Sequence, residues 1–244
     1  MNALLRPGER LDDLQNGYQL IQRPDMFCLG TDSVLLTDFA APRAGEVCVD
    51  LGCGNGAIAL LLAARRADAH IDGVELQMQA ADMAARSVQL NRLEARVRIF
   101  QGDMRDSAAL LGHGGYSLAV CNPPYGARGA AIPSAGEAER IARHEGELAV
   151  QDVAAAAARL LKFGGRFCTV FPSARALEML DAMRAAAIAP KRIRLVHARV
   201  TQPPKLALIE GVRGGKSGLH WLPPLLLYDE TGAHSAEWRR IYGM

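Results

Sequence analysis

Four short apolar segments between residues 46 and 122 each end in a side chain that can accept a hydrogen bond. Short apolar segments bounded by turn residues are typical of buried strands, and helical patterns lie between them. Open α/β sheets bind ligands at the carboxyl ends of parallel strands, where such side chains meet. We therefore predict an α/β fold, doubly wound around a mostly parallel sheet. The ligand-binding strand ends are Asp50, Glu75, Asp103 and Asn122.

A glycine-rich turn follows the first apolar segment. It lies between a strand pattern over residues 47–50 and an apolar helix pattern over residues 57–66, and it carries Gly52, Gly54 and Gly56. The G-x-G-x-G spacing differs from the G-x-G-x-x-G of nicotinamide and flavin enzymes, and either spacing alone is a weak signal. Glu75, 19 residues beyond Gly56, is placed to accept both ribose hydroxyls of an adenosine moiety.

The third segment ends at Asp103, which can accept a hydrogen bond from an adenine amino group. A single acidic residue at a strand end is more often a helix cap or a solvated charge. Four polar strand ends in succession instead indicate one nucleoside-binding edge.

The fourth segment is followed by Asn122-Pro123-Pro124-Tyr125. An amino nitrogen on an adenine ring or a carboxamide is a poor nucleophile because its lone pair is delocalised. The Asn122 side-chain oxygen and the Pro123 carbonyl can each accept one amino hydrogen and so localise that pair, while two prolines stiffen the turn. Tyr125 can stack on a planar ring. An isolated Pro-Pro pair more often marks a surface turn, but beside the glycine turn it predicts methylation of an amine.

These motifs resemble those of class I S-adenosylmethionine-dependent methyltransferases. Within that class they are similar to the bacterial family that methylates the N6 amine of the adenosine beside the anticodon in a valine tRNA. The resemblance covers nearly the whole chain, and its family-like stretches include residues 27–36, 142–145, 159–166 and 190–192. It implies a Rossmann-like, seven-stranded sheet with an antiparallel edge hairpin.

The resemblance also implies that S-adenosylmethionine is the cofactor. Residues implied to bind or lie near it are Gly30, Thr31, Asp50, Gly52, Gly54, Gly56, Glu75, Asp103 and Asn122.

The chain divides into an N-terminal arm, residues 1–45, and a methyltransferase domain, residues 46–244. The arm is expected to pack on the catalytic domain and to carry a strand near residues 17–22 and a helix over residues 32–41. Thr31 or Asp32 is the predicted helix cap.

Residues 126–148 lack clear periodicity and are predicted to form a loop at the substrate mouth. The pattern beyond it predicts a helix over residues 150–161 that Gly164-Gly165 ends, and another over residues 173–187. Strands over residues 192–200 and 205–212 are expected to form an antiparallel pair beside the parallel sheet.

Charge is unevenly distributed although the net charge is only +2. Residues 184–216 carry eight basic side chains and one acidic side chain, Glu210. Such an excess suits phosphate binding, although a solvated strand face has the same composition. We predict an RNA substrate and assign its backbone contacts to Lys191, Arg192 and Arg194.

Composition suggests a cytoplasmic protein. No apolar run approaches 18 residues, and the five cysteines form no Cys-x-x-Cys pair, which is typical of buried thiols in a reducing compartment. The six histidines lack metal-ligand spacing, so no metal is expected. The oligomeric state is not predictable from these features.

Several other activities use similar motifs. Glutamine N5-methylation of a protein requires the same Asn-Pro-Pro-Tyr geometry, but such enzymes usually carry a helical domain ahead of the glycine turn. Guanine N2-methylation of ribosomal RNA uses a related turn that often ends in Phe, and DNA adenine methylation usually needs an added target-recognition domain. A donor-binding RNA module without catalysis is the non-enzyme alternative, against which intact Asn122 and Tyr125 argue.

Overall fold

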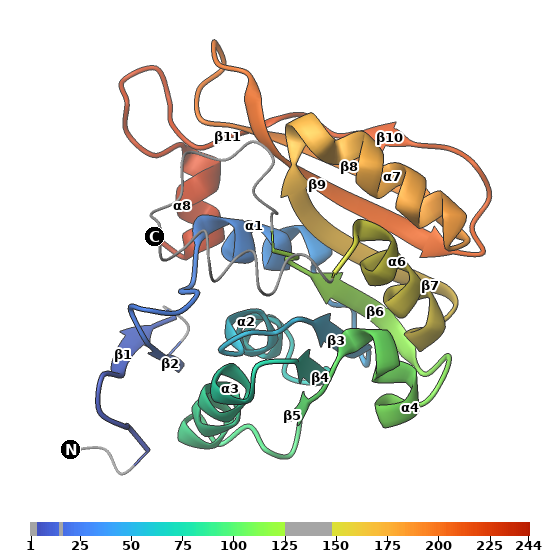
Figure 1. Cartoon of the computed structure of the whole chain (residues 1–244). Helices are drawn as coiled ribbons and strands as arrows, with labels where there is room; N and C mark the ends of the chain where they lie inside the picture. Colours follow the sequence, from blue (N-terminus) through green and yellow to red (C-terminus); the bar gives the residue numbers. More distant parts are fainter. Residues whose placement is uncertain (1–3, 15–16, 125–147) are drawn as a thin grey trace.

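The computed structural model describes residues 4–14, 17–124 and 148–244. Its main sheet has the strand order β5-β4-β3-β6-β7-β9-β8 (Figure 1), and two short strands, β10 (His220–Trp221) and β11 (Leu225–Leu226), pair with the outer side of β8. The longer strands are β3 (Val47–Leu51), β4 (His70–Glu75), β5 (Val97–Gln101), β6 (Tyr116–Cys121), β7 (Leu161–Pro172), β8 (Ile188–His197) and β9 (Pro204–Arg213).

The sheet is parallel from β5 to β7, and β9 runs antiparallel to both of its neighbours. Asp50 of β3 pairs with Gly73 of β4 and with Val120 of β6, so these strands end along one edge. The β8–β9 pair is the predicted antiparallel hairpin. The structure therefore confirms the doubly wound, mostly parallel α/β fold and its seven main strands.

Helices cover both faces of the sheet, as buried parallel strands require. One face carries α1 (Thr31–Ala40), α2 (Ala57–Arg65) and α3 (Met78–Leu90), and the other carries α4 (Ser107–Leu111), α6 (Val150–Leu160) and α7 (Ala176–Ala185). A last helix, α8 (Ala236–Tyr242), packs beside α1 (Figure 1).

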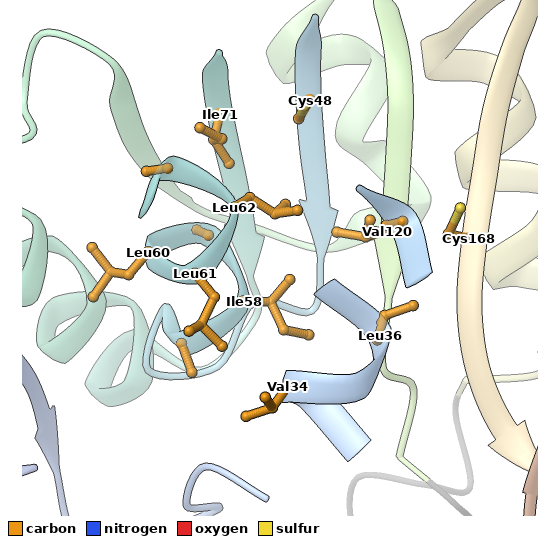
Figure 2. Packing of buried hydrophobic residues seen from close by; sticks show 14 of the residues in the cluster. Val34, Leu36, Cys48, Ile58, Leu60, Leu61, Leu62, Ile71, Val120 and Cys168 are labelled. Atoms are coloured by element: carbon orange, nitrogen blue, oxygen red, sulfur yellow. The ribbon is translucent and has the colours of Figure 1, made fainter. Parts of the chain in front are cut away.

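Each face of the sheet has its own apolar core. On the first face, Leu36 of α1 lies near Val120 of β6, and Leu62 of α2 lies between that helix and β3, which carries Cys48 (Figure 2). On the second face, the helix side chains pack against Phe167 and its apolar neighbours on β7 and β9. Successive residues of one strand therefore serve opposite cores, which explains why the strands read as continuous apolar runs.

The structure differs from the predicted helix ends at two places. Gly30, not Thr31 or Asp32, is the N-cap of α1, and the Asp32 carboxylate accepts a hydrogen bond from the adjacent Ser33 N–H. α6 ends at Leu160, and β7 begins at the next residue, so Gly164-Gly165 does not end the helix.

The glycine pair instead forms a bulge in β7. Four residues of β7 lie opposite a single residue of β6, between the pairs Tyr116–Leu161 and Leu118–Arg166. Gly164 has φ 78°, a left-handed conformation that favours glycine. Both a β-bulge and a helix end favour glycine in the left-handed conformation. The glycine pair was therefore wrongly predicted to end the helix.

The N-terminal arm contains the expected strand, β2 (Gln19–Gln22), paired with an unpredicted strand, β1 (Arg10–Asp13). The arm contacts α3, where the Ser87 hydroxyl accepts from the Ile21 N–H at 3.0 Å and Arg86 pairs with Glu9 at 2.7 Å. The boundary at residue 45 stays a prediction.

Four of the five cysteines are buried, and all five are free thiols. Of the residues described, none belongs to a helix long and apolar enough to cross a membrane. Within the same ranges, no group of three or more His, Cys, Asp or Glu side chains is arranged to hold a metal ion.

Gly73 of β4 packs closely against Cys53 of the glycine turn, and its replacement tests how tightly this region packs. A Cβ atom at Gly73 would lie 2.9 Å from both Cys53 Sγ and Ile99 Cδ1. We expect Gly73→Ala to lower the free energy of unfolding by about 1 to 3 kcal/mol, as overpacking does. Urea denaturation measures this change, and Gly115→Ala is the control because a Cβ there meets no atom within 4 Å. Equal stabilities of the two variants would contradict the tight packing.

Candidate active site

The glycine turn joins β3 to α2 through left-handed backbone. Gly52, Gly54 and Gly56 have φ of 71°, 55° and 85°, a region that L side chains adopt only with strain. The Val74 carbonyl of β4 accepts hydrogen bonds from the N–H groups of Gly52 and Cys53, which fixes the turn above the strand ends. A Cβ at Gly54 would meet nothing within 4 Å, so the turn presents open backbone to a ligand at this point.

Asp50 is the residue before the last of β3, beneath this turn, and is fully buried. Neither of its carboxylate oxygens has a hydrogen-bond partner of normal geometry within the described part of the chain, although the Ala59 backbone lies near enough to lower its pKa. Burial, together with the nearby Glu75 charge, raises the pKa of Asp50 to about 8. A buried carboxylate without a partner is costly, so this site is suited to a ligand that brings a cation.

Glu75 ends β4 and is held by the backbone. Its Oε2 accepts from the Gly54 N–H at 2.9 Å, and its Oε1 accepts from the Gln77 N–H at 2.8 Å. The carboxylate is thereby locked to the glycine turn, in a fixed orientation suited to ribose hydroxyls. Carboxylate oxygens can accept more than one hydrogen bond each, so these contacts are compatible with ligand binding.

Asp103 lies just beyond β5, next to the end of β4. Its carboxylate caps the 3-10 turn over Met104–Asp106 by accepting from the Arg105 N–H at 2.8 Å. The hydrogen bond from the Arg105 side chain lowers the pKa of Asp103, so this carboxylate is ionised at neutral pH. Asp103 is therefore a cap, as single strand-end acids usually are, and its contact with a donor adenine stays a prediction.

Asn122 follows β6 at the same edge of the sheet. Its side-chain Nδ2 donates to the buried Ser33 hydroxyl on α1 at 3.2 Å, which sets the direction of the amide. Pro123 is buried and Pro124 is exposed, whereas Tyr125 and nearly all of the predicted substrate loop, residues 126–147, lie outside the described residues. Gly30 and Thr31 begin α1 and so lie close to Ser33, as a site near the donor requires.

Gln22 is a site residue that the sequence pattern did not indicate. Its Oε1 accepts from Asn55 Nδ2 of the glycine turn at 3.0 Å and from the Leu29 N–H at 2.6 Å. The strand β2 is thus tied both to the glycine turn and to the segment just before α1. A lone glutamine in a short polar strand carries no signal of such a role, and only its strand position next to the turn reveals it.

Two of the predicted RNA contacts take part in ion pairs. Arg192 pairs with Glu210 at 2.7 Å, and Arg194 pairs with Glu237 of α8 at 2.8 Å. Glu210 also pairs with the buried Arg166, which in turn pairs with Glu46. The local basic excess is therefore partly neutralised within the protein.

These arginines lie away from the catalytic turn. Arg192 and Arg194 line a pocket of about 440 Å³ on the α1 face, and Lys191 Nζ donates to the Lys216 carbonyl. Three strand pairings separate β8 from β6, so the structure brings together the four strand ends but not these three residues with them. Their role in binding RNA stays a prediction.

The strand order and the glycine turn are those of the class I methyltransferase fold. A predicted O-methyltransferase from Agrobacterium tumefaciens shares the fold with a TM-score of 0.72 and 21% identity, over 87% of this chain and 96% of that one. Geranyl diphosphate C-methyltransferase from Streptomyces coelicolor A3(2), solved with S-adenosyl-L-homocysteine, has a TM-score of 0.56 and 19% identity, over 74% of this chain and 78% of that one. At these identities the likeness concerns the fold alone.

This chain belongs to the methyltransferase small domain family, whose model matches residues 17–187. A tRNA1(Val) (adenine(37)-N6)-methyltransferase of Aeromonas salmonicida is 39% identical over 153 residues, which is 62% of each chain. The protein of the same name from Tolumonas auensis is 32% identical over 182 residues, or 74% of each chain. The chain thus spans less than two thirds of the first relative and about three quarters of the second.

Proposed function

We propose that this protein transfers a methyl group from S-adenosylmethionine to the N6 amine of an unpaired adenosine in tRNA, the adenosine beside the anticodon of valine tRNA. The observation that carries this proposal is the Asn122 amide, held by Ser33 at the strand edge that also carries Asp50 and Glu75. The names of the relatives from Aeromonas and Tolumonas support tRNA as the substrate and adenine N6 as the methylated atom. A tRNA substrate and five free thiols fit the cytoplasm.

The residues present fit the donor. The open backbone at Gly54 would receive it, Glu75 would accept from its ribose hydroxyls, Asp103 would accept from its adenine amine, and the unpartnered Asp50 would pair with its amino group. When bound, the donor supplies a methyl group on a positively charged sulfur, which makes that carbon electrophilic. The protein's contribution is to position the acceptor amine against it.

The acceptor amine is prepared by the turn after β6. Asn122 Oδ1 and the Pro123 carbonyl each accept one amino hydrogen, so the nitrogen lone pair localises and faces the donor. The Ser33 hydroxyl fixes the Asn122 amide by accepting from its Nδ2, which directs the oxygen to the other side. After transfer the amine is cationic and acidic, and it loses its proton to water without a dedicated base.

The other acceptors are less well supported. Neither of the two relatives named above is a glutamine methyltransferase by name. Neither relative named above is a ribosomal guanine methyltransferase by name. A donor-binding RNA module without catalysis leaves the Ser33–Asn122 hydrogen bond unexplained.

Nucleoside mass spectrometry tests the proposal. Valine tRNA from cells lacking this gene is expected to lose N6-methyladenosine, and the purified protein should restore it in an unmodified transcript. Unchanged N6-methyladenosine together with loss of a methylated glutamine would replace the tRNA proposal with the protein substrate.

Glu75 offers a test of the donor site. We expect Glu75→Ala to weaken binding of S-adenosylmethionine and of its demethylated product alike, by about 1 to 3 kcal/mol, because both present the same ribose hydroxyls. Isothermal titration calorimetry measures both affinities, and Glu94→Ala, an exposed acid after α3, is the control. Unaltered affinity for both ligands would remove Glu75 from the donor site.

A further inference from the structure

Four aromatic rings stack face to face in the C-terminal segment. The Tyr228 and His234 ring centroids are 4.8 Å apart, those of His234 and Trp238 are 3.6 Å apart, and those of Trp238 and Tyr242 are 3.9 Å apart. Adjacent planes differ by only 22°, 7° and 17°, and all four side chains are partly exposed. We name these four residues the aromatic ladder.

The helix α8, which carries Trp238 and Tyr242 of the ladder, has other anchors. Ile241 is buried in the core of the α1 face, Arg194 pairs with Glu237 at 2.8 Å, and Arg240 pairs with Asp38 at 3.2 Å. Apolar and ionic contacts thus already fasten α8 to α1 and β8. The half-exposed rings are therefore available for another role.

The ladder connects the active site to the β8–β9 hairpin. At its inner end, burial raises the pKa of Tyr242 while a hydrogen bond to Thr31 partly opposes the rise, which places this ring at the start of α1, two residues from Ser33. At its outer end, the Tyr228 N–H donates to the Ala198 carbonyl of the hairpin at 3.0 Å. Figure 1 shows α8 beside α1 on the side where the hairpin projects.

Two exposed cations lie on the hairpin to which the Tyr228 backbone is hydrogen-bonded. Arg199 and Lys205 lie on the hairpin, and neither forms an ion pair with any residue that the structure describes. Arg199 extends toward the turn after Tyr228, since a Cβ on Gly232 would lie 3.2 Å from its Nη2. Residues 194–205 and 228–242 together carry five basic and three acidic side chains, so the surface has a positive balance.

We propose that the aromatic ladder and the cations Arg199 and Lys205 bind the unpaired RNA strand next to the nucleotide that is methylated. This inference rests on the proposed function. A base of the strand stacks on the outer ring, Tyr228, and its phosphates contact the two hairpin cations. Aromatic faces combined with nearby basic groups suit unpaired nucleotides, because a duplex keeps its base faces covered.

The aromatic ladder lies outside the part of the sequence that matches the family model. It lies wholly beyond residue 187, where the match to the family model ends. The core that binds the donor and aims the amine is therefore shared with the family, whereas the surface that selects the polymer is supplied by the C-terminal segment.

Substitution of Tyr228 tests the stacking surface. Tyr228→Leu keeps apolar bulk but removes the ring, and it is expected to raise the KM for an unmodified valine tRNA transcript about 5-fold to 150-fold. The kcat and the donor affinity should stay at wild-type values. Tyr228→Phe keeps the ring and should resemble wild type, as should Trp221→Leu, which removes an exposed aromatic ring on β10. A wild-type KM in Tyr228→Leu, or an equal rise in Tyr228→Phe, would overturn the proposal.

Photocrosslinking tests the same surface in the unaltered protein. A transcript with 5-iodouridine in the anticodon loop is irradiated with wild-type protein, and mass spectrometry should map the crosslink to the peptide that contains Tyr228. Crosslinks confined to other peptides would overturn the RNA surface. If wild-type protein methylates no RNA, the proposed function itself fails, whereas normal methylation without a Tyr228 contribution removes only the ladder.

Discussion

Replacing Asn122 with alanine is expected to slow methyl transfer by about 100-fold to 1,000-fold, comparable to the loss of one preorganised polar group in other enzymes. The physical reason is that Asn122 Oδ1 accepts the amino hydrogen most strongly when the lone pair localises, so the interaction favours the transition state over the bound substrate. Single-turnover transfer of labelled methyl groups to a valine tRNA transcript measures the rate.

The donor affinity of Asn122→Ala should remain that of wild type, because the proposed role of its Oδ1 is to accept from the acceptor amine and its Nδ2 donates to Ser33. Asn91→Ala is the control for loss of an amide side chain, because Asn91 is the C-cap of α3 and its amide bonds the Gln19 backbone. Loss of donor affinity together with activity would make Asn122 a residue of the donor site or of the fold.

The sequence was sufficient for the sheet and its active edge because these depend on local pattern. Buried parallel strands need continuous apolar residues, and Asp50, Glu75 and Asn122 stand out where such runs end. β1 escaped prediction because Arg10–Asp13 is a polar run whose pairing with β2 is its main support. Ser33 and Gln22 escaped because their partners, Asn122 and Asn55, are distant in sequence.

The basic stretch shows why a count of charges along the sequence does not by itself locate a phosphate-binding surface. Glu237 neutralises Arg194 from a position 43 residues further along the chain, and Glu210 takes part in pairs with both Arg192 and Arg166. A count over a sequence window cannot detect either arrangement. The ladder had only a partial sequence signal, since Trp238 and Tyr242 are four residues apart and share a face of α8, whereas His234 precedes that helix.

Donor affinity is expected to rise about tenfold per pH unit as the pH increases toward 8, and then to level off. In the donor-free protein, burial raises the pKa of Asp50 to about 8, so below that pH this carboxyl is protonated. Pairing with the donor's amino group requires the ionised form, and the proton must therefore leave on binding. Calorimetry in two buffers of different ionisation enthalpy should detect the released proton at pH 6 and little release at pH 9.

Asp50→Asn separates this linkage from other effects of pH. The variant should bind the donor about 150-fold to 5,000-fold more weakly at pH 8, because removing one partner of a buried ion pair costs about 3 to 5 kcal/mol, and its residual affinity should not vary with pH in this range. The free energy of unfolding of the donor-free protein should fall as the pH rises, whereas donor affinity rises. In the unfolded protein the Asp50 carboxyl releases its proton near pH 4, well below its pKa in the folded protein. The wild-type protein therefore loses stability as the pH rises from about 4 to 8, and Asp50→Asn does not. If the variant kept the wild-type pH dependence of donor binding, another group would be the one that releases the proton.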